Sequence, residues 1–106
     1  MVRYLLLLPV LLPVLLLGSH PAASRTWPEE KCDRYGRAWT EAMRRQGAQD
    51  LSAAFLEGHA AFLSSGCRQR NACPRTREDY AMADLMTVLA LNAGMSGTFL
   101  PFICRP

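Results

Sequence analysis

The stretch GCRQRNACPRTR, residues 66–77, constrains the whole of this 106-residue chain. It contains two of the four cysteines, Cys67 and Cys73, and the other two, Cys32 and Cys104, lie far to either side of it. Each half of the chain can therefore be tied back to this one segment. Near its end, Thr76 is suited to cap a helix that begins at the next residue.

The first 24 residues are typical of an export signal. The apolar run Tyr4–Leu17 has 14 residues, which fits the roughly 7–15 of a signal-peptide core and falls short of the roughly 20 of a membrane-spanning helix. Small residues then lead to Ser24, a suitable cleavage position. We predict a cleavable signal peptide over 1–24 and a single domain over 25–106. Cleavage after Ala23 and an uncleaved membrane anchor are the alternatives.

All four cysteines lie in the predicted domain, and an even number in an exported chain indicates disulfides. A domain of this size buries a small core, and small exported domains are commonly reinforced by such bonds. No two cysteines have C-x-x-C spacing, so we expect neither zinc nor a redox-active pair, and no cofactor. The predicted location is secreted or periplasmic.

Four cysteines allow three pairings, and the expected topology ranks them. If the first two helices form an antiparallel hairpin, Cys32 at the start of one lies beside Cys67 at the end of the other. Cys73 then pairs with Cys104, because the tail can fold back to reach it. The favoured pairing is therefore Cys32–Cys67 with Cys73–Cys104. The alternatives are Cys67–Cys73 with Cys32–Cys104, and Cys32–Cys73 with Cys67–Cys104.

Two helices are expected before this segment. Glu29 follows Thr26 by three residues, a capping-box spacing, and apolar residues then recur every three to four positions until a glycine ends the pattern. Asp50 is expected to cap a second helix that ends at Ser65–Gly66. Gly58 in the middle of that helix costs about 1 kcal/mol relative to alanine, unless it lets another helix approach closely.

A third helix is expected from Thr76 to Gly94. Residues 85–91 are apolar almost all round, which predicts that this helix is the most buried of the three. The apolar residues 99–103 follow, and Cys104 is expected to lock them onto the core. No segment alternates as a strand would, so the fold class is all-α: a small disulfide-stapled bundle of three helices, antiparallel to their neighbours, plus an apolar C-terminal segment packed on the core.

Residues with catalytic chemistry are few. His59 is the one histidine of the predicted domain, and no serine or cysteine motif that would use it is present. We expect it to be hydrogen-bonded in the core or to lie on the surface. The carboxylates gather at the predicted helix starts, where the helix dipole accounts for them. We therefore expect a protein that is not an enzyme, with no catalytic, cofactor-binding or metal-binding residues.

Arginines are the most suggestive surface feature. Arg68, Arg70, Arg75 and Arg77 lie within ten residues, beside cysteines that fix the backbone. Such a cluster suits carboxylates or phosphates, although a solvated loop in an arginine-rich chain is the simpler interpretation. The net charge of +3 is too small to indicate specific nucleic-acid binding. The expected partner is a protein or an anionic envelope component, and we expect no membrane span after cleavage.

In outline, the domain is similar to two groups of small exported bacterial helical proteins. ACPRT at 72–76 and LPFIC at 100–104 resemble immunity proteins that block type VI secretion amidase effectors. The other group, the acid-stress chaperones of the periplasm, is lysine-rich, whereas Lys31 is the one lysine here. Neither resemblance is specific enough to assign the chain to a family. We expect a small exported binding protein; the alternatives are an inhibitor or immunity protein against a secreted enzyme, and a chaperone-like lipid or peptide carrier.

Overall fold

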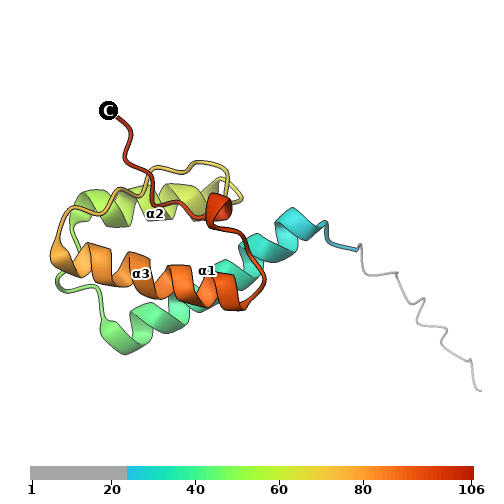
Figure 1. The fold of residues 1–106 in the computed structure, drawn as a ribbon, viewed down its shortest axis with the longest axis horizontal. Coiled ribbons are helices and arrows are strands. Elements are labelled where there is room, and N and C mark those ends of the chain that lie inside the picture. Colours follow the sequence, from blue (N-terminus) through green and yellow to red (C-terminus); the bar gives the residue numbers. More distant parts are fainter. Residues whose placement is uncertain (1–23) are drawn as a thin grey trace, which may run out of the picture.

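The computed structural model describes residues 24–106, which form three α-helices and a short 3-10 helix (Figure 1). The elements are α1 (Trp27–Gln46), α2 (Ala53–Ser64), α3 (Arg77–Asn92) and η1 (Gly97–Phe99). The described residues contain no strand, so the all-α class and the three-helix architecture are confirmed. Apart from its last residue, the predicted signal peptide lies outside the described residues. None of the helices in this part of the chain is long and apolar enough to cross a membrane.

α1 begins and ends where the sequence predicts. The Thr26 hydroxyl accepts a hydrogen bond from the Glu29 N–H at 3.3 Å, and the Glu29 carboxylate accepts one from the Thr26 N–H at 3.2 Å. This reciprocal capping box satisfies N–H groups that a helix start otherwise leaves free. At the other end, the Gly47 N–H donates to the Met43 carbonyl. Local sequence therefore sets both ends of this helix.

α2 begins two residues later than predicted. Its N-cap is Ser52, whose hydroxyl accepts a hydrogen bond from the Phe55 N–H at 3.2 Å, so the assignment of Asp50 as the cap is wrong. The Ser52 hydroxyl also donates to the buried carboxylate of Asp79 at 2.6 Å. Serine and aspartate have similar capping preferences, and a contact with α3 selects the serine.

The N-termini of α2 and α3 lie side by side. Asp79 in the first turn of α3 binds Ser52 at the start of α2, while the intervening segment carries the chain back along α2 (Figure 1). α2 and α3 therefore run in the same sense, and α1 runs against both (Figure 1). The antiparallel expectation holds for α1 and α2. It is wrong for α2 and α3, because the segment that joins them is long enough to return to the start of α2.

The core lies where α2 meets the middle of α1 and one side of α3. Five large side chains from these helices are almost fully buried: Tyr35, Phe55, Phe62, Met82 and Met86. The Tyr35 ring meets the Phe62 ring edge-on at a centroid distance of 5.3 Å. Aromatic rings from α1 and α2 therefore form the centre of the domain, and methionines of α3 fill the space beside them.

α3 is less buried than its composition predicts. Its buried residues form one stripe along the helix: Asp79, Met82, Ala83, Met86 and Ala90. On the other side Val88 is 55% exposed and Leu91 is 52% exposed. α3 has more buried residues than α1 or α2, as predicted, but its apolar residues are not buried on all sides, because neighbouring elements cover only one side of it.

The apolar C-terminal segment packs on the core as a small addition to the three helices. The Phe99 ring lies edge-on to the rings of Tyr35 and Phe62, at centroid distances of 5.7 and 5.6 Å. The Phe102 ring stacks on Phe55 at 5.9 Å. Each of these contacts covers an aromatic ring of α1 or α2, so the tail closes the side of the core that α3 leaves open.

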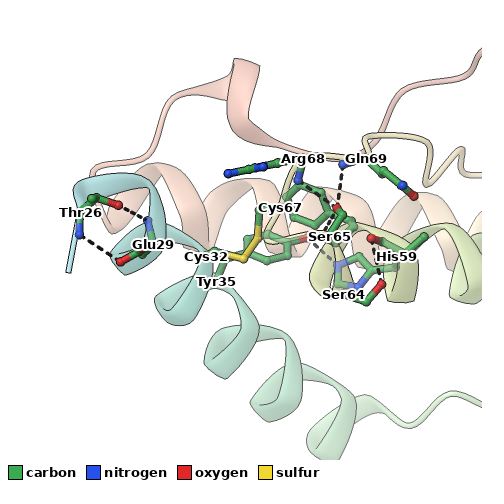
Figure 2. Close-up of a disulfide and its surroundings, with 12 residues drawn as sticks. Thr26, Glu29, Cys32, Tyr35, His59, Ser64, Ser65, Cys67, Arg68 and Gln69 are labelled. Carbon is green, nitrogen blue, oxygen red and sulfur yellow. Dashed lines mark hydrogen bonds between the residues drawn. A yellow bond between two sulfur atoms is a disulfide. The ribbon is translucent and has the colours of Figure 1, made fainter. Parts of the chain in front are cut away.

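Two disulfides hold the helices and the tail together. Cys32 of α1 is bonded to Cys67, just after α2 (Figure 2), and Cys73 is bonded to Cys104 in the tail. The Cα atoms of the two pairs are 5.6 and 4.6 Å apart. This is the pairing favoured from the sequence. The α1–α2 hairpin joins the first pair, as expected, whereas the tail reaches Cys73 by running beside the segment before α3.

Candidate functional site

The candidate site is the arginine loop, our name for residues 67–76, which lies along α2 (Figure 1). Its start is fixed by Ser65, whose hydroxyl accepts hydrogen bonds from the Arg68 and Gln69 N–H groups at 3.1 and 2.8 Å (Figure 2). The Cys67 N–H donates to the Phe62 carbonyl at 2.8 Å. The end of α2 therefore holds the first residues of the loop, in addition to the disulfide at Cys67.

Gly58 lets the middle of the arginine loop rest directly on α2. A Cβ atom at this position would overlap the carbonyl oxygen of Asn71 and would lie 3.0 Å from the Cα of Ala72. Such contacts are too short for any side chain, so the loop backbone occupies the space that a side chain would need. The sequence had suggested that this glycine admits a neighbouring helix. The structure has a loop in that position.

The tail holds the loop from its other side. The Ala72 N–H donates to the Pro101 carbonyl at 2.8 Å, and the Cys73–Cys104 disulfide follows directly. Next to it, the Arg105 side chain donates to the Arg70 carbonyl at 3.3 Å. Arg105 is therefore a further arginine of this surface, which the sequence reasoning missed. The favoured pairing of Cys104 with Cys73 could have identified it, because Arg105 is the next residue.

The arginines of the loop lack the acidic partners that the arginines of α1 have. Each α1 arginine lies 2.6 to 2.9 Å from a carboxylate of the same helix, in the pairs Arg34–Glu30, Arg37–Asp33, Arg44–Glu41 and Arg45–Glu41. Within residues 24–106, no carboxylate lies within 4.0 Å of the guanidinium groups of four other arginines: Arg68, Arg70, Arg75 and Arg105. Positive charge on the loop and tail is therefore not neutralised within the described domain.

The four arginines singled out from the sequence have separate surroundings. Arg68 lines a large open groove beside α1, and Arg75 lines a smaller pocket of about 300 Å³ together with Glu57. The Arg70 side chain donates to the Thr98 carbonyl, which holds it against the tail. Arg77 is the first residue of α3, its side chain is 94% exposed, and it reaches Glu78 only at 4.0 Å. The four side chains therefore have different neighbours and do not share one site.

His59 is buried in the core. Its ring stacks on Trp39 at a centroid distance of 3.5 Å, and its Nε2 lies 2.7 Å from the Tyr35 hydroxyl (Figure 2). Burial lowers the pKa of His59 to about 3 and raises the pKa of Tyr35, so both side chains are neutral near pH 7. The Tyr35 hydroxyl and His59 Nε2 therefore form a hydrogen bond between two neutral groups.

The surroundings of His59 fit a structural role. Its Nδ1 is buried and has no hydrogen-bond partner in the described part of the chain, and the residue is 1% exposed. A substrate could not reach this ring without displacing the core. The four cysteines, the strongest nucleophiles of the chain, are all in disulfides. Across residues 24–106, no group of three histidine, cysteine, aspartate or glutamate side chains is arranged to hold a metal ion.

Compared with models of known protein families, with curated proteins and with solved structures, the chain has no significant match.

Proposed function

We propose that the protein is a small exported binding protein, secreted or periplasmic and without a catalytic role, that contacts an acidic partner protein through the arginine loop and Arg105. The observation that carries this proposal is the set of arginines whose guanidinium groups have no carboxylate within 4.0 Å among the described residues. The two disulfides support the location, because such bonds persist outside the reducing cytoplasm.

The way in which the loop is held supports binding. Its backbone is fixed by Ser65, by the close contact at Gly58 and by both disulfides. A fixed loop loses little conformational freedom when a partner binds, so more of the interaction energy appears as affinity. Guanidinium groups on such a backbone can each form two parallel hydrogen bonds to a carboxylate of the partner.

Inhibition of a secreted enzyme is the second candidate function. The favouring observation is again the rigid, arginine-bearing loop between two disulfides, because a pre-organised loop suits tight occupation of an enzyme surface. The carrier alternative has less support. Phe55, Phe62 and Phe102 fill the interior volume in which a carrier of this size would enclose a lipid.

A capture experiment tests the binding function. The disulfide-bonded protein is immobilised and exposed to envelope and culture-fluid fractions of the source cells, and bound proteins are identified by mass spectrometry. The test variant is Arg68→Ala/Arg75→Ala. The matched control is Arg44→Ala/Arg45→Ala, which removes the same charge from arginines that already pair with Glu41.

The proposal is supported if an acidic protein is captured by the wild type and by the control variant but not by the test variant. Added salt should weaken the same complex, because unburied charges are screened. Equal retention by the two variants would contradict the role of the loop. If the captured partner is an enzyme, its activity with and without the protein separates an inhibitor from an adaptor.

A further inference from the structure

An open groove of about 1250 Å³ lies between α1 and the end of α2. Its apolar lining comes from Leu63, Phe99 and the Cys32–Cys67 disulfide. Gly36 faces this region of α2, since a Cβ atom on it would lie 3.6 Å from a Leu63 methyl group. The groove is therefore walled by a helix on one side and by the start of the arginine loop on the other.

The acidic residues that line the groove all have partners. The Glu29 carboxylate accepts from the Thr26 N–H, and Asp33 pairs with Arg37 at 2.7 Å. Glu41 binds two arginines of its own helix turn. A positively charged ligand would therefore have to compete with existing ion pairs or with a helix cap.

Two cations of the groove have no such partner. No carboxylate among residues 24–106 lies within 4.0 Å of the Lys31 ammonium or of the Arg68 guanidinium. The Lys31 ammonium lies 5.1 Å from the centre of the Phe99 ring, so a charge and an apolar surface are adjacent. Arg68 extends over the Cys32–Cys67 disulfide in Figure 2, and its backbone is held by Ser65.

We propose that this groove binds a short acidic and apolar peptide segment of the partner protein, with an apolar side chain against Phe99 and Leu63 and a carboxylate near Lys31 and Arg68. The inference rests on the proposed function, and it assigns the acidic and apolar segment of the partner to this groove. Charge complementarity favours an acidic ligand, because two cations of the groove have no ion-pair partner, whereas the one lining carboxylate without such a partner, Glu29, is held in the helix cap.

The size of the groove fits a peptide better than a small molecule. The lining residues of α1 extend from Pro28 to Glu41, about 20 Å of helix. An extended chain of about six residues covers that length. The groove is also larger than the roughly 300–1,000 Å³ of sites for small molecules.

The test is an NMR titration of the protein with both disulfides intact. The probe is the acetylated, amidated peptide LFDDE, and the matched probe is LFNNQ, which has nearly the same shape without the charges. A third sample contains phosphatidylglycerol vesicles in place of peptide. The test variant is Lys31→Gln/Arg68→Gln. The control variant is Arg34→Gln/Arg45→Gln, which removes the same charge from two arginines of α1 that do not line the groove.

The proposal requires that LFDDE shifts the amide signals of Gly36, Gly66 and Phe99 and that LFNNQ binds much more weakly. The test variant should bind LFDDE about tenfold more weakly or worse, and the control variant should change the affinity by less than about twofold. The variants are compared only where their circular dichroism melting curves match that of the wild type.

Several results would overturn the proposal that this groove binds the peptide. They are equal affinity of the test variant and the wild type, absence of LFDDE binding, and binding of the vesicles in preference to both peptides. Shifts confined to residues 70–77 and Arg105 would also overturn it. None of these results decides the binding function itself, because the capture experiment tests that separately with the natural partner.

Discussion

The buried carboxylate of Asp79 accepts hydrogen bonds from both the backbone N–H and the hydroxyl of Ser52, at 2.8 and 2.6 Å. It also accepts from the Arg75 and Thr76 N–H groups at 2.9 and 3.1 Å. Burial alone would raise the pKa of Asp79, but these hydrogen bonds, first among them those from Ser52, lower it to about 2. One acid thus joins the start of α2, the start of α3 and the end of the arginine loop.

Asp79→Ala should lower the free energy of unfolding by about 3 kcal/mol or more, because it leaves several buried donors without an acceptor. Chemical denaturation monitored by circular dichroism measures the change. Asp84→Ala is the matched control: it removes an exposed carboxylate from the same helix and should change stability by less than about 0.5 kcal/mol. Similar losses in the two variants would mean that helix charge, and not the buried network, matters at Asp79.

Stability should fall as the pH falls below about 6.5. The pKa of His59 is lowered from 6.5 to about 3 in the folded state, so the unfolded chain binds the proton more readily between these values. Each pH unit in this window costs about 1.4 kcal/mol at most, and a loss of about 2–3 kcal/mol is expected between pH 6.5 and 4.5. Asp79 adds a further loss only below its ordinary value of 3.8.

His59→Gln separates the contribution of His59 from that of the carboxylates. Glutamine keeps a hydrogen-bonding group for the Tyr35 hydroxyl but does not titrate. Unfolding free energies measured from pH 7 to 4 should lose most of their slope above pH 4.5 in this variant. The same slope in wild type and variant would show that His59 is not the group that titrates.

Two glycine-to-alanine substitutions should have opposite effects. Gly58→Ala should destabilise the domain by about 2 kcal/mol or more, because the new methyl group meets the backbone of Asn71 and Ala72. Gly36→Ala meets only a Leu63 methyl group at ordinary contact distance and should be neutral or stabilising by up to about 1 kcal/mol. Thermal unfolding of the pair measures both. Equal melting temperatures would mean that the arginine loop does not rest on Gly58.

The disulfide pairing can be read from one digestion. Trypsin cleaves after Arg68 and Arg70, which puts Cys67 and Cys73 on different peptides. Without reducing agent, the peptide that contains Cys32 should be linked to the one that contains Cys67. Any other linked pair in the mass spectrum would contradict the structure.

Removal of the second disulfide should release the tail. Cys73→Ser/Cys104→Ser should cost about 2–5 kcal/mol, as is usual for a disulfide in a small domain. The double variant avoids leaving one reactive thiol. Quenching of Trp39 fluorescence by acrylamide should also rise, since the Phe102 ring would leave the neighbourhood of Phe55 and His59. A variant that melts like the wild type would mean that the tail is not structural.

Helix ends that depend on residues close in sequence could be predicted from the sequence. Contacts between residues far apart in sequence could not. Thr26 and Glu29 are three residues apart, so the capping box is visible in the sequence. The choice of Ser52 over Asp50 depends on Asp79, 27 residues further on. The burial of α3 was overestimated because its composition does not tell which of its sides is covered.

The candidate site was predicted in part. The arginines of residues 68–77 could be named because they are close in sequence, and their support by disulfides followed from the ranked cysteine pairing. Their lack of acidic partners could not be predicted, because it depends on which carboxylates face them in space. The groove beside Arg68 depends on how α1 crosses the end of α2, and no local pattern specifies that angle.

The two disulfides close segments that follow one another along the chain, 32–67 and then 73–104, without overlap. The polypeptide emerges with its N-terminus first, so Cys32 and Cys67 are both available for bonding before Cys104, the last cysteine, has appeared. Joining thiols in their order of appearance gives the correct bonds directly. An interlaced pattern would require an early wrong bond to be attacked and exchanged. We therefore expect an oxidant alone, without an isomerase to correct wrong bonds, to be enough for the native pairs to form.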